Sequence, residues 1–157
     1  SRLPFAPLPS IQPTSFIIIM TAMVFDMEVG FLVGNTAALV SNIFLGQGPW
    51  TPWQMFSWGM MGLIGGLLKD TAIMKTKWGL CIYGFIWGFI FGWTMNLWFL
   101  LFFKTQGITW KVILGAAIAS FKFDLSHALG NVVFIWLFSK SFVKTLTRIK
   151  TKYGVLR

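Results

Sequence analysis

The sequence predicts an all-α integral membrane protein, a bundle of five to six transmembrane helices in one domain over residues 1–157. Its 157 residues are 56% hydrophobic and 18% aromatic, with a mean hydropathy of +0.73. Only 11% are charged, whereas soluble domains carry about 25%. The length suits five or six helices, because each one needs about 20 apolar residues to cross a bilayer. Composition therefore favours a membrane bundle over a soluble domain.

The net charge of +9 does not indicate nucleic-acid binding, because the lysines gather in the hydrophilic gaps and do not interleave with aromatic residues. A single cysteine, Cys81, excludes an internal disulfide. Residues 1–13 hold four of the six prolines and no apolar leader segment, so they are predicted as an outer loop. The bundle then has five helices, or six if a first helix precedes this sequence.

Five apolar stretches predict the helices. The first is about 18 Å long at 1.5 Å per residue and barely crosses a bilayer on its own. The last is one long kinked helix or two shorter ones, because Lys122 and Asp124 interrupt its apolar run. The predicted spans are 14–25, 29–45, 52–68, 78–103 and 108–147, which make up a helical bundle over 14–147, followed by a basic cytoplasmic tail over 148–157.

The stretch 46–66, GQGPWTPWQMFSWGMMGLIGG, predicts a turn followed by a helix start. Thr51 is expected to cap this helix, with Pro52 at the first helical position and Gln54 reaching back. Trp50 and Trp53 flank the start, as aromatic side chains do at a membrane–water boundary. Small residues at helical spacing predict close helix packing at Gly30, Gly34 and Ala38, at Gly59, Gly62 and Gly66, and at Gly84, Gly88 and Gly92.

The basic residues orient the bundle. If 108–139 crosses the membrane once, the gap 69–77 and the tail after residue 139 share one side, which holds most lysines and arginines. The positive-inside rule makes that side cytoplasmic and places the loop 46–51 outside. The basic tail is then expected to determine the orientation in the membrane and to contact anionic lipid, or alternatively to dock a cytoplasmic partner.

Polar residues inside the spans are candidate ligand contacts, because they are costly there and usually face a cavity or a partner. Asp124, His127 and Asn131 share one helix face. In the competing interpretation Asp124 caps a restarted helix, and the other two bond to neighbouring helices. No metal site is expected, because His127 has no second histidine or cysteine at ligand spacing. Asn42 and Asn96 are equally consistent with ligand contact and interhelical hydrogen bonding.

No catalytic constellation is present in the sequence. There is no nucleophile elbow, and the GxxxGxxxG pattern at 84–92 lies inside an apolar helix, where it is a packing face and not a nucleotide site. An enzyme or an ATPase within this chain is therefore not expected.

Four blocks resemble the substrate-binding S components of energy-coupling factor (ECF) transporters: PLPSIQPTSFIIIMTAMVFD, GFLVGNTAALVSN, GQGPWTPWQMFSWGMMGLIGGLL and FDLSHALGNVVF. They cover most of residues 9–138 in order. The resemblance implies a six-helix protein of the bacterial plasma membrane that captures a vitamin from outside and delivers it by toppling while bound to the transmembrane subunit EcfT. It implies that two cytoplasmic ATPases, EcfA and EcfA′, use ATP and Mg²⁺, and that this chain binds no cofactor.

The resemblance places the vitamin pocket among the loop 46–54, the outer half of 93–104 and the stripe 121–131. It makes Gly30, Gly34 and Ala38 the expected docking face for EcfT. The block GPWTPWQM is most similar to cobalamin-type (CbrT-like) members, so a corrinoid is the expected ligand. Riboflavin, folate or pantothenate are alternatives, as are a small secondary carrier without ATPases and a structural scaffold. The expected substrate-binding residues are Asn42, Trp50, Thr51, Trp53, Gln54, Trp93, Asn96, Asp124, His127 and Asn131.

Overall fold

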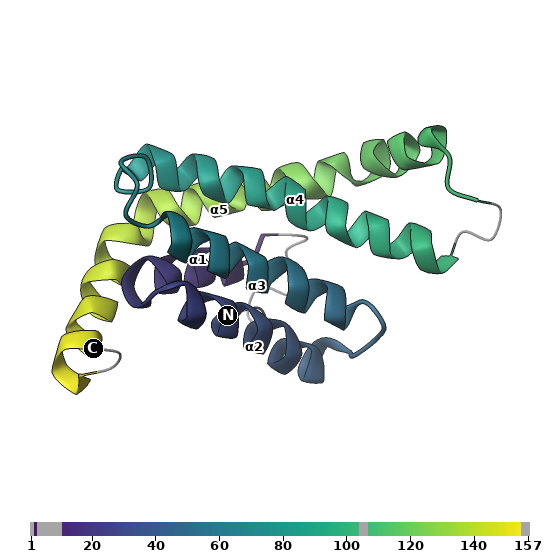
Figure 1. Cartoon of the computed structure of the whole chain (residues 1–157). Helices are drawn as coiled ribbons and strands as arrows, with labels where there is room; N and C mark the ends of the chain where they lie inside the picture. Colours follow the sequence, from purple (N-terminus) through teal and green to yellow (C-terminus); the bar gives the residue numbers. More distant parts are fainter. Residues whose placement is uncertain (1, 3–10, 104–106, 155–157) are drawn as a thin grey trace.

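Five helices make up the secondary structure that a computed structural model describes for Arg2, residues 11–103 and residues 107–154 (Figure 1). Parts of the predicted loop 1–13, of the turn at 104–107 and of the tail lie outside these residues. The all-helical prediction is confirmed, a helix is present in each of the five predicted stretches, and the last stretch is one helix. The helices are α1 (Thr14–Phe25), α2 (Met27–Leu45), α3 (Thr51–Leu68), α4 (Lys77–Phe103) and α5 (Trp110–Tyr153).

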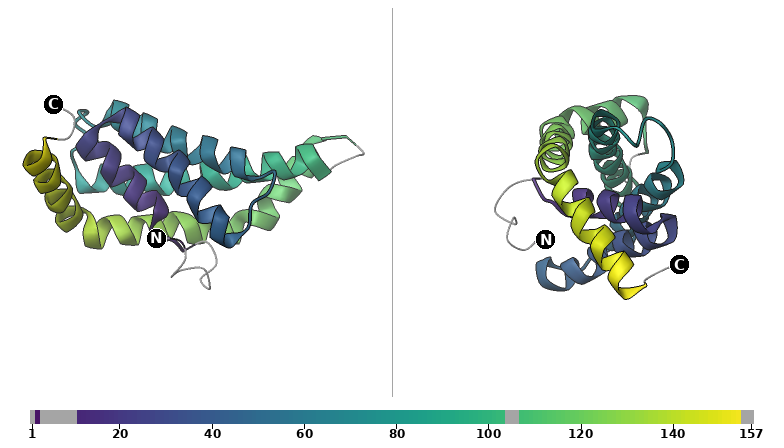
Figure 2. Two further views of the ribbon diagram at one scale, coloured as in Figure 1. Left: turned by 90° about the horizontal axis from the view of Figure 1, so that it is seen from below. Right: turned by 90° about the vertical axis from the view of Figure 1, so that its left-hand side faces the viewer.

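The helices form two hairpins with α1 between them. α2 packs along α3 and α4 packs along α5, while α1 contacts all four of the other helices. The sequence of α1, TSFIIIMTAMVF, is apolar on every side, as expected of a helix that is buried all round. Figure 2 shows this short helix enclosed by the longer ones. α1 is therefore the central element of the bundle.

Within the part of the chain that the structure describes, three helices are long and apolar enough to cross a membrane: Met27–Leu45, Lys77–Phe102 and Trp110–Tyr153. The last of these has 44 residues, about 66 Å at 1.5 Å per residue, which is roughly twice the thickness of a hydrocarbon core. Its final part, yellow in Figures 1 and 2, turns away and crosses the end of the bundle. There the Lys150 Nζ donates to the carbonyl oxygen of Val24 at 2.9 Å.

The charged residues Lys122 and Asp124 do not interrupt α5, contrary to the interpretation that residues 108–147 form two shorter helices. Lys122 is exposed on the helix surface. Asp124 accepts a hydrogen bond from the Ser120 hydroxyl one turn earlier, at 2.8 Å. Because this bond lies within the helix, the carboxyl group is accommodated without a restart, and Asp124 caps nothing.

A single residue, Asp26, joins α1 to α2. Its φ of 133° lies in a region that non-glycine residues rarely adopt. The carboxylate accepts from the Met27 N–H at 2.9 Å and pairs with the Lys69 ammonium group at 3.0 Å. Both interactions favour the charged form and lower the pKa of Asp26. The connection thus ties the end of α1 to the end of α3.

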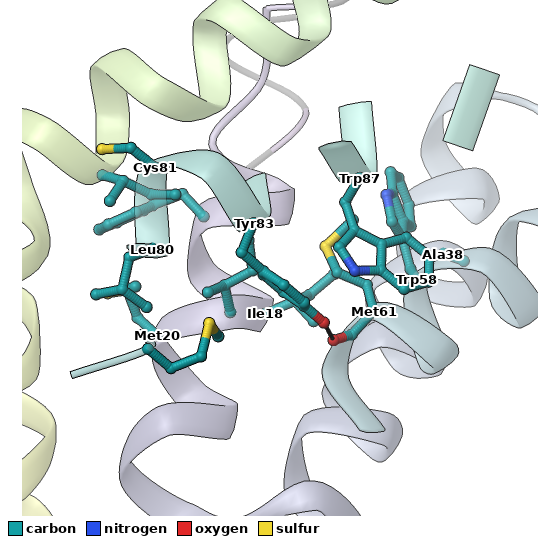
Figure 3. Close-up of a cluster of buried hydrophobic side chains, with 13 residues drawn as sticks. Ile18, Met20, Ala38, Trp58, Met61, Leu80, Cys81, Tyr83 and Trp87 are labelled. Carbon is teal, nitrogen blue, oxygen red and sulfur yellow. Dashed lines mark hydrogen bonds between the residues drawn. The ribbon is translucent and has the colours of Figure 1, made fainter. Parts of the chain in front are cut away.

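Figure 3 shows the apolar core where α3 and α4 meet α1. Ile18 and Met20 come from α1, Met61 from α3, and Tyr83 and Trp87 from α4. The Tyr83 hydroxyl donates to the carbonyl oxygen of Met61 at 2.6 Å. Since a buried hydroxyl needs a partner, this bond lets a tyrosine occupy the core and fixes α4 against α3.

Glycines bring the backbones of α2 and α3 together. A Cβ atom added at Gly30 would lie 2.6 Å from the carbonyl oxygen of Gly62, and one at Gly34 would overlap the backbone of Trp58. Ala38, on the same face, is fully buried. The face that was expected to dock EcfT is therefore occupied within the chain by α3, so it is not on the surface of this structure.

The capping box predicted at the start of α3 is not formed. The residue at the N-cap position is Trp50, with no side-chain cap bond, and Thr51 is the first helical residue. The Thr51 hydroxyl donates to Gln47 Oε1 at 2.9 Å, and Gln54 points to Asn42 instead of reaching back. The physical reason is that the buried amide of Asn42 needs partners, whereas the N–H groups of Thr51 and Gln54 already bond to the carbonyl oxygens of Gly48 and Trp50.

Replacing Gly62 with leucine is expected to destabilise the protein, because its Cβ would overlap the carbonyl group of Gly30. Overpacking of this kind costs about 1–3 kcal/mol. Thermal unfolding in detergent measures the effect, with Gly115→Leu as the control, since a Cβ there meets nothing within 4 Å. Equal unfolding midpoints for the two variants would contradict the close approach of α2 and α3.

Candidate functional site

A cavity of about 150 Å³ lies at the N-terminal end of α1. Because α1 has only 12 residues, it starts inside the bundle and leaves space beyond its first turn. Thr14 and Ser15, the first two residues of α1, are 2% and 0% exposed. Side chains from four helices and from the segment before α1 surround the space: Arg2, Gln12, Thr14, Ser15, Gln54, Trp58, Phe91 and His127.

One wall of the cavity is aromatic. Trp58 of α3 and Phe91 of α4 stack with their ring centres 5.1 Å apart and an interplanar angle of 17°. His127 of α5 meets the same Phe91 ring edge-on at 5.1 Å, and its Nε2 is 2.8 Å from the Ser15 hydroxyl. The Nε1–H of Trp58 is buried and meets no acceptor among the described residues. This wall can contact a flat ring through stacking.

The other wall is a network of amide groups. Asn42 of α2 is 2% exposed, and its Nδ2 donates to Thr51 Oγ1 at 2.9 Å and to Gln54 Oε1 at 2.7 Å. Its Oδ1 accepts from Arg2 Nη1 at 2.8 Å. Arg2 also donates through Nε to Gln12 Oε1 at 2.9 Å. These bonds connect α2, α3 and the segment before α1.

Arg2 sits between the two walls. Its guanidinium carbon lies 5.1 Å from the centre of the Trp58 ring, within the range of a cation–π interaction. Arg2 Nη1 donates to the Ser41 hydroxyl at 2.8 Å as well. A permanently charged group is therefore held at the cavity by side chains of α2 and by the face of a tryptophan.

Of the ten residues predicted to bind substrate, the structure brings four to this region. Gln54 and His127 line the cavity. Asn42 lies behind Gln54 and donates to it, and Thr51 accepts a second hydrogen bond from the same Asn42 amide. Asn42 and His127 were selected as polar residues inside predicted spans, and Thr51 and Gln54 as members of the loop 46–54 that the resemblance assigns to the pocket.

A second polar cluster lies between α4 and α5, and its members do not line the cavity. Asn96 Nδ2 donates to the Ser120 hydroxyl at 2.7 Å, and that hydroxyl bonds to Asp124. Asp124 packs against Gly92, where a Cβ atom would overlap the carboxylate. Asn131 donates to the carbonyl oxygen of Gly84 at 2.9 Å. Asn96, Asp124 and Asn131 are thus placed in interhelical contacts.

The three predicted tryptophans also lie outside the cavity lining. Trp50 meets Trp98 edge-on, with ring centres 5.9 Å apart. Trp93 is 59% exposed, and Trp53 is half-buried. Their positions fit the aromatic belt that tryptophans form at a membrane boundary.

Sequence reasoning missed most of the lining residues. Trp58 had a signal, because it follows Gln54 by four residues and so shares its helix face. Gln12 was a polar residue beside an apolar helix start. Arg2, Ser15 and Phe91 had no local signal that distinguishes a cavity residue from a packed one. Among the described residues, no group of three histidine, cysteine or acidic side chains gathers as a metal site.

A comparison with protein families identifies this architecture. The model of the family described as "ECF-type riboflavin transporter, S component" matches residues 2–144, a range that includes every residue lining the cavity. No curated protein and no solved structure matches the chain. S components are substrate-binding subunits that work with EcfT and EcfA subunits. The chain therefore belongs to the ECF-type riboflavin transporter S-component family, as a membrane-embedded, vitamin-binding transporter subunit that is not an enzyme.

Proposed function

We propose that this chain binds riboflavin from the outer side of the membrane and delivers it through an ECF transporter. The observation that carries the proposal is the match to the riboflavin-type family over residues 2–144. In this proposal the chain delivers the vitamin while bound to EcfT within the membrane, the ATPases EcfA and EcfA′ hydrolyse ATP with Mg²⁺, and the chain itself binds only the vitamin.

The chemistry of the cavity supports a flavin. Riboflavin has a flat three-ring system with carbonyl and ring-nitrogen acceptors along one edge. The stacked Trp58 and Phe91 offer an aromatic wall to such rings. Arg2, Gln12 and Gln54 offer polar groups opposite. An apolar pocket with a few oriented polar groups is the usual form of a small-molecule site.

Size separates riboflavin from the corrinoid expected from the sequence. The cavity of about 150 Å³ is smaller than the roughly 300–1,000 Å³ of most ligand pockets, so even a flavin requires the outer ends of the helices to move apart. A corrinoid is several times larger than a flavin and requires a far greater opening. The cobalamin interpretation also relied on the GPWTPWQM block, whose Trp50 and Trp53 do not line the cavity.

We also propose that the C-terminus is cytoplasmic. Lys69 pairs with Asp26 at one end of α1, and Lys150 of the α5 tail donates to Val24 at the same end. The basic gap between α3 and α4 and the basic tail therefore gather at one end of the bundle, opposite the cavity. The positive-inside rule favours the cytoplasm for that end.

Purified protein in detergent is expected to quench the fluorescence of riboflavin saturably, with one vitamin bound per chain, and to bind no cobalamin in calorimetry. Phe91→Leu should weaken riboflavin binding roughly three- to tenfold, because it removes an aromatic stacking partner. The control Phe121→Leu, at an exposed position on α5, should leave the affinity unchanged. Tight binding of cobalamin without riboflavin would reject the proposal.

Labelling with a membrane-impermeant maleimide tests the orientation. In a Cys81→Ser background, Pro49→Cys is expected to react in intact cells, because residue 49 lies in the exposed loop between α2 and α3. Lys152→Cys, in the tail, is expected to react only after the cells are opened. Labelling of Lys152→Cys in intact cells would reverse the proposed topology.

A further inference from the structure

We infer that a chain of side chains starting at Arg2 leaves only hydrogen-bond donors on the amide wall of the cavity, and that Asn42 is the residue that orients the donor of Gln54. The ligand must then present an acceptor edge to this wall, which deepens the proposed riboflavin function and rests on it. Asn42 itself does not line the cavity, so it acts through Gln54.

The chain starts from a group that cannot accept a hydrogen bond. An arginine guanidinium has five N–H donors and no acceptor. Any amide that meets it must therefore present its oxygen. Arg2 meets two amides in this way, Gln12 through Oε1 at 2.9 Å and Asn42 through Oδ1 at 2.8 Å. The shape of an amide group does not distinguish its oxygen from its nitrogen. A partner that only donates, such as the Arg2 guanidinium, identifies the oxygen.

The orientation of the Asn42 amide in turn fixes the orientation of the Gln54 amide on α3. With its oxygen bonded to Arg2, its NH₂ group faces Thr51 Oγ1 at 2.9 Å and Gln54 Oε1 at 2.7 Å. Gln54 must therefore present its oxygen to Asn42. The Thr51 hydroxyl accepts this bond and donates its own hydrogen to Gln47 Oε1 at 2.9 Å. Asn42 is 2% exposed, so water does not compensate for a reversed amide.

The result is a wall of donors. The oxygens of both Gln12 and Gln54 are used, by Arg2 and by Asn42. Neither Nε2 group makes a hydrogen bond with any residue in the described part of the chain, and both side chains line the cavity. The two Nε2 groups and the Nη2 group of Arg2, whose Nε and Nη1 are already bonded, thus remain for the ligand. The C2 and C4 carbonyl oxygens of the isoalloxazine ring are acceptors of the kind that such a wall requires, and the N3–H between them must bond outside this wall.

The experiment compares riboflavin with its 2-thio and 4-thio analogues, because sulfur is a weaker hydrogen-bond acceptor than oxygen. Wild-type protein is expected to bind at least one thio analogue about tenfold more weakly than riboflavin. Asn42→Asp keeps an oxygen for Arg2 but replaces the NH₂ group, so Gln54 turns its own NH₂ toward residue 42 and its oxygen toward the cavity. Riboflavin affinity should then fall at least tenfold, and the preference over the thio analogue should shrink to about twofold.

Gln54→Met provides an independent arm, because it removes the donor at similar length; it should lose the same preference even if Asn42→Asp does not fold. Asn35→Asp is the matched control, since it makes the same substitution on α2 at an amide that bonds to the carbonyl oxygen of Phe31 and does not line the cavity; its affinities should stay within twofold of wild type. Thermal unfolding in detergent verifies that each variant is folded.

The outcomes separate the two proposals. If wild-type protein binds no riboflavin, the proposed function fails and this inference fails with it. If wild-type protein binds riboflavin but accepts both thio analogues equally well, the donor wall is refuted while the proposed function stands. The donor wall is refuted in the same way if folded Asn42→Asp or Gln54→Met keeps the wild-type preference.

Discussion

The close approach of α2 and α3 at their glycines is the constraint on which the rest of the structure depends. Without side chains at Gly30 and Gly62, the two backbones are in contact. This contact sets the register of the hairpin and places Asn42 beside Thr51 and Gln54 at the other end. A wider separation would leave the amide of Asn42 without its partners. The same distance between α2 and α3 therefore determines both the backbone contact at the glycines and the hydrogen bonds of Asn42 beside the cavity.

The sequence was sufficient to predict the helices but only part of the site. The apolar runs and the breaks at Asp26, Gly46 and Lys69 define the spans within a few residues, because helix length in a membrane is set by composition. The glycine faces were recognisable, but their partner was not. The Gly30 face looks the same whether it packs on another subunit or, as here, on α3.

The site was predicted where a polar residue had to be buried. His127 was recognisable because polar groups are rare inside spans, and Gln54 because the resemblance assigns the loop 46–54 to the pocket. Arg2 was not, since its contact with Asn42 joins residues that are far apart in the sequence. Trp50 and Trp93 were selected for the opposite reason: a tryptophan at the membrane boundary has the same local sequence signal whether it contacts lipid or ligand.

The depth of the cavity follows from how α1 is fixed. Its C-terminal end is held by the Asp26–Lys69 ion pair and by Lys150, and its other end forms the floor of the cavity. The number of residues in α1 therefore sets the distance between its fixed C-terminal end and the floor of the cavity. One added residue would raise the floor by about 1.5 Å and turn Thr14 and Ser15 by about 100°. The length of a helix, and not only its composition, thus determines the depth of this cavity.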